Sequence, residues 1–175
     1  MDSININLPI SQEIIKTLNA GQKVFLSGQI LTARDAAHKR MIEYIENGKR
    51  LPFDIQNQGI YYCGPTPAKQ GFPIGACGPT TSGRMDAYVK TLFENGLKFM
   101  IGKGNRNQEV KESIVKFQGI YFIATGGAGA SYAQCVKKCQ CLAWQDLGAE
   151  AVYLLDIETF PVYVGLDIYG KDIYL

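Results

Sequence analysis

A regular alternation of apolar runs and helical patterns in the second half of the chain limits the possible folds most. The runs LKFMIG (97–102) and IYFIATGG (120–127) are rich in β-branched and aromatic residues, which predicts strands. Between them, NQEVKESIVKFQG (107–119) has apolar residues at helical spacing. Strands that alternate with helices in this way are typical of an α/β domain.

The rest of the chain extends this pattern. We expect helices at 11–21, 34–48, 85–96 and 130–148, with Ser11 as the N-cap of the first, and strands at 23–33, 59–63, 149–157 and 160–175. The last strand is expected to fold back as a hairpin across IYGKD (168–172). Because such ends favour antiparallel pairing, a purely parallel sheet of the Rossmann type is not expected.

Composition narrows the class of protein. The 175 residues are 46% hydrophobic and 19% charged, a globular balance, and nothing in the sequence divides residues 1–175 into more than one domain. The net charge of +2 is too small to favour nucleic acid or an anionic membrane as the main partner. No apolar run has the length of a membrane span, and the polar start is unlike a signal peptide. With an odd count of five cysteines, we expect a cytoplasmic protein with free thiols.

The segment GPTTSGRMD (78–86) combines hydroxyls, glycine and an arginine. If a helix begins at Thr80 or Thr81, the amides of residues 81–83 point outward without partners, and such a helix start binds anions. Arg84 adds a planar fork that matches a carboxylate or phosphate, and on a helix it would share a face with Thr80. The segment therefore predicts an anion site.

A plainer interpretation fits the same residues. A threonine before a helix often serves only as an N-cap, and Arg84 could pair with Asp86 or face solvent. The coincidence of two threonines, a glycine and an arginine within nine residues favours the anion site.

A second arginine stands where another strand gives way to a helix, in LTARDAAH (31–38). Asp35 complements the helix dipole, whereas Arg34 at the same point opposes it. We therefore expect Arg34 to face a small anionic ligand. His38, the only histidine, is expected to be a polar helix residue.

Two glycine-rich turns fail known phosphate signatures. MIGKGN (100–105) places Lys103 between glycines but lacks the following Ser/Thr and the upstream glycine of a P-loop. ATGGAGAS (124–131) lacks the last glycine of a dinucleotide fingerprint and is expected to be a strand-to-helix turn that can line a site. The sequence CGPT occurs at 63–66 and again at 77–80, and a long loop of the kind that is often functional is expected between the copies.

The cysteine spacing does not favour a metal site. Cys135, Cys139 and Cys141 follow C-x3-C-x-C, which matches neither a zinc nor a usual iron–sulfur pattern. On the helix expected at 130–148, Cys135 and Cys139 would share one face as small buried thiols.

Four of these segments resemble a known family. SGQILTARDAAHKRM, GPTTSGRMD, MIGKGN and ATGGAGA occur in the same order as in the beta subunit, or C-terminal domain, of class I fumarate hydratases and L-tartrate dehydratases, which are iron–sulfur hydro-lyases. The resemblance runs from about Leu8 to Tyr169. It implies a swivelling β/β/α domain, in which a mixed, partly barrel-like sheet has flanking helices.

The resemblance also implies roles for individual residues. Arg34, Arg84 and Lys103 match the family's dicarboxylate-binding positions, with Thr81 as a further substrate-binding residue. Thr80 matches the family's proposed base, which an aspartate of the other subunit activates; the sequence leaves open which of the two threonines is the base.

The resemblance further implies a partner, the alpha subunit, that holds a [4Fe-4S] cluster whose open iron binds the substrate, so that the two form a hetero-oligomer. This chain would bind no cluster and would have no activity alone.

Three interpretations remain open on sequence alone. The leading one is the beta subunit of a hydro-lyase acting on a four-carbon dicarboxylate, with fumarate/L-malate favoured over L-tartrate. The second is a non-enzymatic module that binds an anion or nucleotide, against which the failed signatures count. The third is a non-catalytic interaction or regulatory subunit on the same scaffold.

Overall fold

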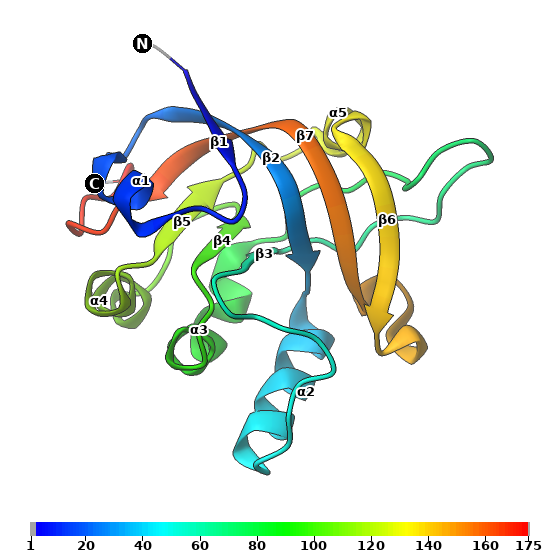
Figure 1. The fold of residues 1–175 in the computed structure, drawn as a ribbon, viewed down its shortest axis with the longest axis horizontal. Helices are drawn as coiled ribbons and strands as arrows, with labels where there is room; N and C mark the ends of the chain where they lie inside the picture. Colours follow the sequence, from blue (N-terminus) through cyan, green and yellow to red (C-terminus); the bar gives the residue numbers. More distant parts are fainter. Residues whose placement is uncertain (1–2, 175) are drawn as a thin grey trace.

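The computed structural model describes residues 3–174, which form one seven-stranded mixed sheet with helices around it (Figure 1). The strands are β1 (Ile4–Asn7), β2 (Lys23–Thr32), β3 (Gly59–Tyr61), β4 (Phe99–Gly102), β5 (Ile120–Ile123), β6 (Val136–Ala143) and β7 (Val152–Leu166). The α-helices are α1 (Gln12–Thr17), α2 (Asp35–Glu46), α3 (Asp86–Glu94), α4 (Gln108–Phe117) and α5 (Gly129–Gln134). Two 3-10 helices, η1 (Ser82–Met85) and η2 (Gln145–Glu150), complete the set.

Five of the strands close into a barrel. Strands β2, β3, β4 and β5 pair in parallel in that order, and β7 then pairs antiparallel with both β5 and β2. β1 and β6 extend the sheet beyond this ring, on β2 and β7 respectively. The expectation of a mixed, partly barrel-like sheet with flanking helices is therefore confirmed.

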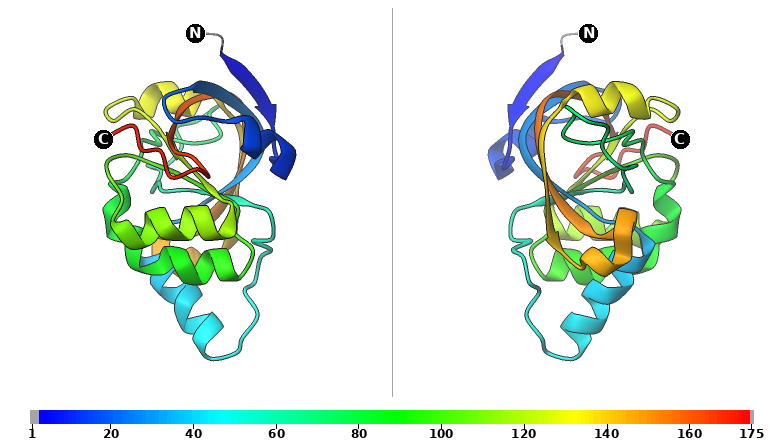
Figure 2. Two further views of the ribbon diagram at one scale, coloured as in Figure 1. Left: turned by 90° about the vertical axis from the view of Figure 1, so that its left-hand side faces the viewer. Right: turned by 90° about the vertical axis from the view of Figure 1, so that its right-hand side faces the viewer.

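Alternating side chains of the barrel strands supply two cores. On β4, for example, Phe99 and Ile101 belong to one buried cluster and Met100 to the other. The first cluster draws on all five barrel strands and fills the interior, while the second also contains the apolar faces of α2, α3 and α4. Figure 2 shows these three helices together on one side of the barrel and α5 at the opposite end. The period-2 alternation thus positions the helices as well as the strands.

The prediction of a helix at 130–148 is wrong. Only Gly129–Gln134 is helical, and the chain then forms β6, which pairs antiparallel with β7. Residues 136–143 include good helix formers, but pairing along the long β7 outweighs that local preference. Cys135 and Cys139 consequently do not share a helix face.

The closing strands also differ from expectation. One 15-residue strand, β7, replaces the two strands expected at 149–157 and 160–175. The reverse turn at 168–172 is present: Gly170 N donates to Asp167 O at 3.1 Å, and an antiparallel bridge joins Leu166 to Asp172. Here the expected hairpin is reduced to this single bridge.

The other expected elements are present, including the Ser11 cap, whose side chain accepts a bond from Ile14 N. Among residues 3–174, no helix combines the length and the apolar character that crossing a membrane requires.

Candidate functional site

The predicted site residues follow the carboxyl ends of the parallel strands. Thr32, Tyr61 and Ile101 lie side by side in register across β2, β3 and β4. Arg34 comes two residues after β2, and Lys103 comes directly after β4. Ligands of α/β sheets commonly bind beyond this edge, because the loops that follow the strands converge there.

Backbone hydrogen bonds hold the two threonines beside Lys103. Thr80 N donates to Tyr62 O at 2.6 Å, and Lys103 N donates to Thr80 O at 3.3 Å. Ser82 N donates to Lys103 O at 2.8 Å, so its amide is not free as the sequence had suggested. Together these bonds make a short parallel bridge between Thr81 and Lys103 that continues the sheet.

The helix that follows begins later than expected. The 3-10 helix η1 starts at Ser82 and leads into α3 at Asp86, with Thr81 in the N-cap position. The Thr81 side chain makes no capping hydrogen bond, so capping does not account for its presence. Thr80 precedes the helix and therefore does not share a helical face with Arg84.

Arg84 makes a two-point pair with a carboxylate of another helix. Its Nε and Nη2 donate to the two carboxylate oxygens of Asp35 at 2.9 and 2.7 Å. The alternative pairing with Asp86 is wrong, since Asp86 accepts from the buried Arg106 at 2.7 Å. The Arg84 side chain is 50% exposed, so it stays within reach of a ligand.

Arg34 lies at the N-cap position of α2, close to Gly64 and to Glu150. Its Nη2 is 3.5 Å from Glu150 Oε1, and its Nε is 3.7 Å from Asp35 Oδ2. The buried Nε has no hydrogen-bond partner within residues 3–174. A Cβ added at Gly64 would lie 2.7 Å from Arg34 Cδ, so only glycine leaves room for this side chain.

The N-terminus of α2 is capped from a distance. Glu150 Oε2 accepts a hydrogen bond from Ala36 N at 2.7 Å. Arg34 cannot provide this cap, so a carboxylate 114 residues further along the chain satisfies the helix end. Glu150 therefore fixes both the helix and the arginine that precedes it.

Lys103 is the least compensated of the three cations. It is half-buried, and no carboxylate of residues 3–174 lies within 4 Å of its Nζ. A Cβ added at Gly126 would lie 3.6 Å from that Nζ, so the turn 124–131 borders Lys103 as the sequence had suggested. The turn 124–131 also borders the segment 78–86, because a Cβ added at Gly129 would lie 2.9 Å from Gly78 N.

A buried polar network supports the site from beneath. The Ser82 and Tyr121 hydroxyls lie 2.9 Å apart, and Tyr121 OH also donates to Gly104 O at 2.9 Å. The guanidinium of Arg106 lies 4.8 Å from the Tyr121 ring centre and 5.4 Å from that of Tyr62. Burial raises the pKa of Tyr121, which therefore stays protonated. Tyr121 thus links Ser82, at the start of η1, to Gly104, the residue after Lys103.

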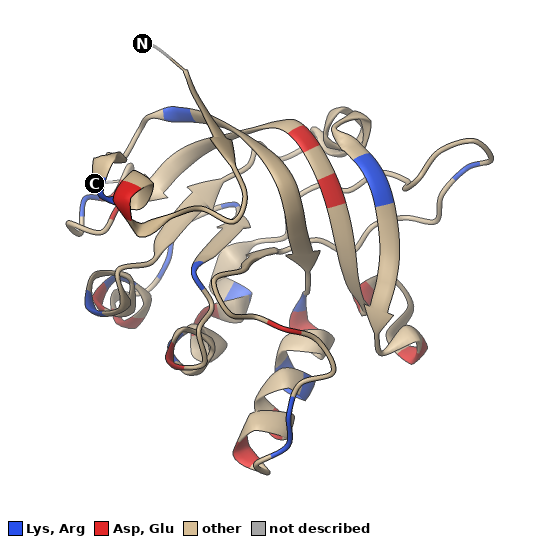
Figure 3. Cartoon of the chain, in the orientation of Figure 1, with Lys and Arg blue, Asp and Glu red and all other residues tan. Residues whose placement is uncertain are grey.

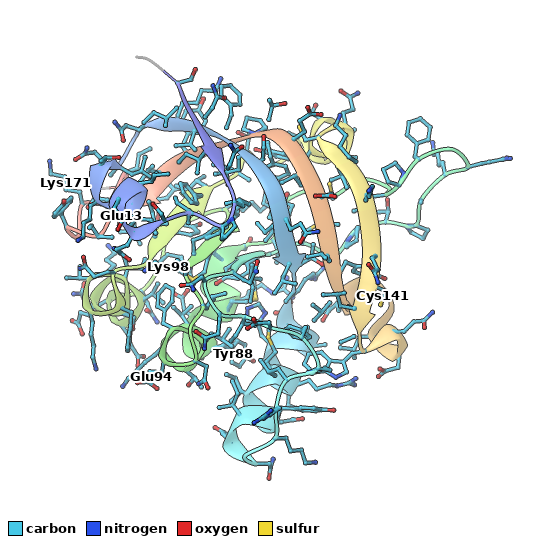
Figure 4. The ribbon with its side chains drawn as sticks, viewed as in Figure 1. Glu13, Tyr88, Glu94, Lys98, Cys141 and Lys171 are labelled. Carbon is cyan, nitrogen blue, oxygen red and sulfur yellow. The ribbon has the colours of Figure 1, made fainter. Side chains whose placement is uncertain are left out.

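His38 lies on α2, as expected, and its side chain is completely buried. Its Nδ1 lies 2.8 Å from Arg34 O, and its ring centre lies 5.2 Å from that of Tyr62 and 5.7 Å from that of Tyr88, which Figure 4 shows on α3. Complete burial lowers the pKa of His38 from 6.5 to about 4, so the ring is neutral near pH 7.

The cysteines do not fit an iron–sulfur cluster. Cys63 and Cys77 are buried, and their mutual hydrogen bond and burial raise the pKa of Cys63. Cys141 is exposed on the outer strand β6 (Figure 4). No group of three or more His, Cys, Asp or Glu side chains within residues 3–174 could hold a metal ion.

The charges at this edge favour an anion. The cations are Arg34, Arg84 and Lys103, and the carboxylates are Asp35 and Glu150, so one net positive charge remains. Asp35 links the two arginines. Figure 3 shows acidic and basic residues mixed along the helices. The fold is a mixed α/β barrel domain, and these charged residues gather beyond the carboxyl ends of its parallel strands.

Comparison with known proteins identifies the family. The family described as "Fumarase C-terminus" matches residues 1–175, and the chain belongs to it. It is thus related to the C-terminal domain of class I fumarate hydratases.

The relatives differ in length. The chain is 40% identical to Leishmania major "Fumarate hydratase 1, mitochondrial" and 38% identical to Escherichia coli "Fumarate hydratase class I, anaerobic"; each match covers 98% of this chain and 32% of the relative. A Methanocaldococcus jannaschii protein provisionally named L(+)-tartrate dehydratase subunit beta is 33% identical, over 94% of this chain and 88% of its own length. The chain therefore spans about a third of the fumarate hydratases.

Proposed function

We propose that this chain is the beta part of an iron–sulfur hydro-lyase that reversibly hydrates a four-carbon dicarboxylate. The observation that carries the proposal is that the three cations and Thr80 all lie in segments beyond the carboxyl ends of β2, β3 and β4. Thr80 is hydrogen-bonded to Lys103 through the main chain, and Arg84 is linked to Arg34 through Asp35. Family membership supports it, and so does a relative of nearly the same length that is named as a beta subunit.

The three cations would bind the substrate carboxylates. Arg84 uses Nε and Nη2 to hold Asp35, and this carboxylate orients the guanidinium, so Nη1 would donate to the ligand. Lys103 supplies a charge that no carboxylate among residues 3–174 pairs with. Removing a proton from the carbon beside a carboxylate builds negative charge on that carboxylate. Cations already in place stabilise this transition state more than the ground state.

Thr80 would move the proton. A hydroxyl is a poor base by itself, so the role requires an acceptor for the hydroxyl proton, which a carboxylate of the partner would provide. Thr80 is held beside Lys103 by main-chain hydrogen bonds, which do not use its hydroxyl.

The iron–sulfur cluster that the resemblance implies would belong to the partner. The cysteines of this chain do not fit it, so the roles of the chain's own residues are confined to binding, orientation and proton movement. A cytoplasmic location stays a prediction.

Fumarate and L-malate are the proposed substrates, because the two fumarate hydratases named above, at 40% and 38% identity, are more similar to this chain than the tartrate dehydratase subunit at 33%. The test is an anaerobic assay of the chain assembled with its alpha-type partner, against fumarate, L-malate and both tartrate enantiomers. We expect turnover of fumarate and L-malate. Preferential dehydration of L-tartrate would instead support the tartrate dehydratase alternative.

A further inference from the structure

The loop between the two CGPT copies projects from the body of the molecule. Residues 64–79 contain no helix or strand, and Figure 1 shows the segment extending beyond the barrel on the side of β6 and α5. Two hydrogen bonds tie its limbs together at the base, from Thr66 N to Ala76 O at 3.0 Å and from Gly75 N to Thr66 O at 3.1 Å. Residues 66–76 are called the arm below.

Apolar hollows lie on both sides of the arm. One, of about 570 Å³, opens between the arm and α5 and is lined mostly by apolar atoms, with Lys69 at its border. The other, of about 410 Å³, lies toward β6 and η2. Phe72, on the arm, is 66% exposed and is the most exposed large hydrophobic side chain of residues 3–174. Exposed apolar surface next to apolar hollows is typical of a protein–protein contact.

The arm is continuous with the candidate site. It leads through Cys77 and Gly78 directly to Thr80, and Cys77 N donates to Gly129 O at 3.1 Å at the start of α5. Gly126, which borders Lys103, precedes the same helix by three residues. A partner that covers Thr80 and Lys103 would therefore also meet the arm and α5.

We propose that the arm and the hollow beside α5 are the docking surface for the alpha-type subunit, and this inference rests on the proposed function. The fumarate hydratases favour this occupant, because this chain matches only 32% of their length and the other two thirds of each polypeptide is joined to the matched domain in one chain. The partner would insert an apolar segment beside Phe72 and place an acidic side chain near Lys69. Contact here would hold the two halves of the site together without taking part in the reaction.

The experiment measures affinity between this chain and its alpha-type partner, the chain of the same genome that resembles the unmatched two thirds of the fumarate hydratases. Phe72→Asp puts a charge on the exposed arm, and Ala130→Glu puts one at the exposed start of α5. Tyr169→Asp is the matched control, an aromatic side chain that is 62% exposed in the C-terminal turn at the other end of the molecule. Melting temperatures of the separate chains show that each variant is folded.

Phe72→Asp and Ala130→Glu should each raise the dissociation constant by about tenfold or more, as expected for a central interface residue, while the control leaves it unchanged. At saturating partner, kcat should be the same for all variants. If the unaltered chain binds the partner and both of these variants bind equally well, the docking-surface inference is wrong and the proposed function stands. If the unaltered chain does not bind the partner, both fail. Self-association of the chain that Phe72→Asp abolishes would instead assign the arm to a second copy.

Discussion

Replacing Thr80 by alanine tests whether its hydroxyl has a catalytic or a structural role. The main-chain bonds of Thr80, to Tyr62 O at 2.6 Å and from Lys103 N at 3.3 Å, do not involve its side chain and survive the substitution. The N-cap position belongs to Thr81, not Thr80. Thr80→Ala should therefore change the free energy of unfolding by no more than about 0.5 kcal/mol, whereas loss of a functional N-cap costs about 1 kcal/mol.

The expected effect on turnover is much larger. Proton transfer by a positioned side chain contributes roughly 10²–10⁴-fold, so kcat of the assembled enzyme should fall by that factor with little change in apparent substrate binding. The assay is anaerobic steady-state hydration of fumarate by the complex, with the melting temperature measured on the same preparation. Thr81→Ala is measured beside it, because its exposed side chain neighbours the same bridge and the comparison decides which of the two threonines is the base.

Two results would refute this reasoning. A destabilised but fully active Thr80→Ala enzyme would mean that the hydroxyl only supports the fold. A loss of kcat on Thr81→Ala, with Thr80→Ala active, would transfer the base to the neighbouring threonine.

Three further predictions concern the site and its support. Arg84→Lys keeps the charge but loses the two-point geometry, so kcat/KM of the assembled enzyme should fall about 10–100-fold, as for one charge-assisted hydrogen bond; an unchanged value would remove Arg84 from the site. Tyr121→Phe should lower the free energy of unfolding in urea by about 2–3 kcal/mol, because it leaves the Ser82 hydroxyl and Gly104 O without their buried partner, and a change below 1 kcal/mol would contradict that network. The pKa of His38 is about 4 in the folded state and near 6.5 in the unfolded state, so the unfolded state binds the proton more readily. The free energy of unfolding should therefore decrease by about 2 kcal/mol when the pH is lowered from 7 to 5. His38 is the only histidine, and a flat profile over this interval would show that it is not buried as described.

Local sequence signals predicted most of the elements, because periodicity and caps are local properties. Ser11, for example, marks the first turn of α1 by its own side chain. The residues 136–143 show where this fails, since their strand exists only because β7 offers an edge to pair with. The closure of the barrel was likewise invisible to local patterns, because it depends on β7 meeting both β2 and β5.

The candidate site shows the same division. Arg34, Arg84 and Lys103 stand out because glycines and strand ends surround them in the sequence. Glu150 and Tyr121 reach the site only through the fold, from segments whose sequences carry no signal of a site. Glu150 was foreseeable only in part, because Arg34 is a poor cap and some acceptor had to satisfy the start of α2. Its identity required the tertiary structure.

The most direct test of the composite site is a titration of this chain into a fixed amount of the alpha-type subunit under anaerobic conditions, with the initial rate of fumarate hydration as the readout. We predict no rate with either component alone, and a rate that rises with added chain and saturates when the complex is complete. The same titration with a chain carrying Lys103→Ala should reach a much lower plateau at an unchanged midpoint. Activity of this chain alone, or a fully formed complex with no activity toward fumarate, malate or tartrate, would contradict the assignment of half an active site to this domain.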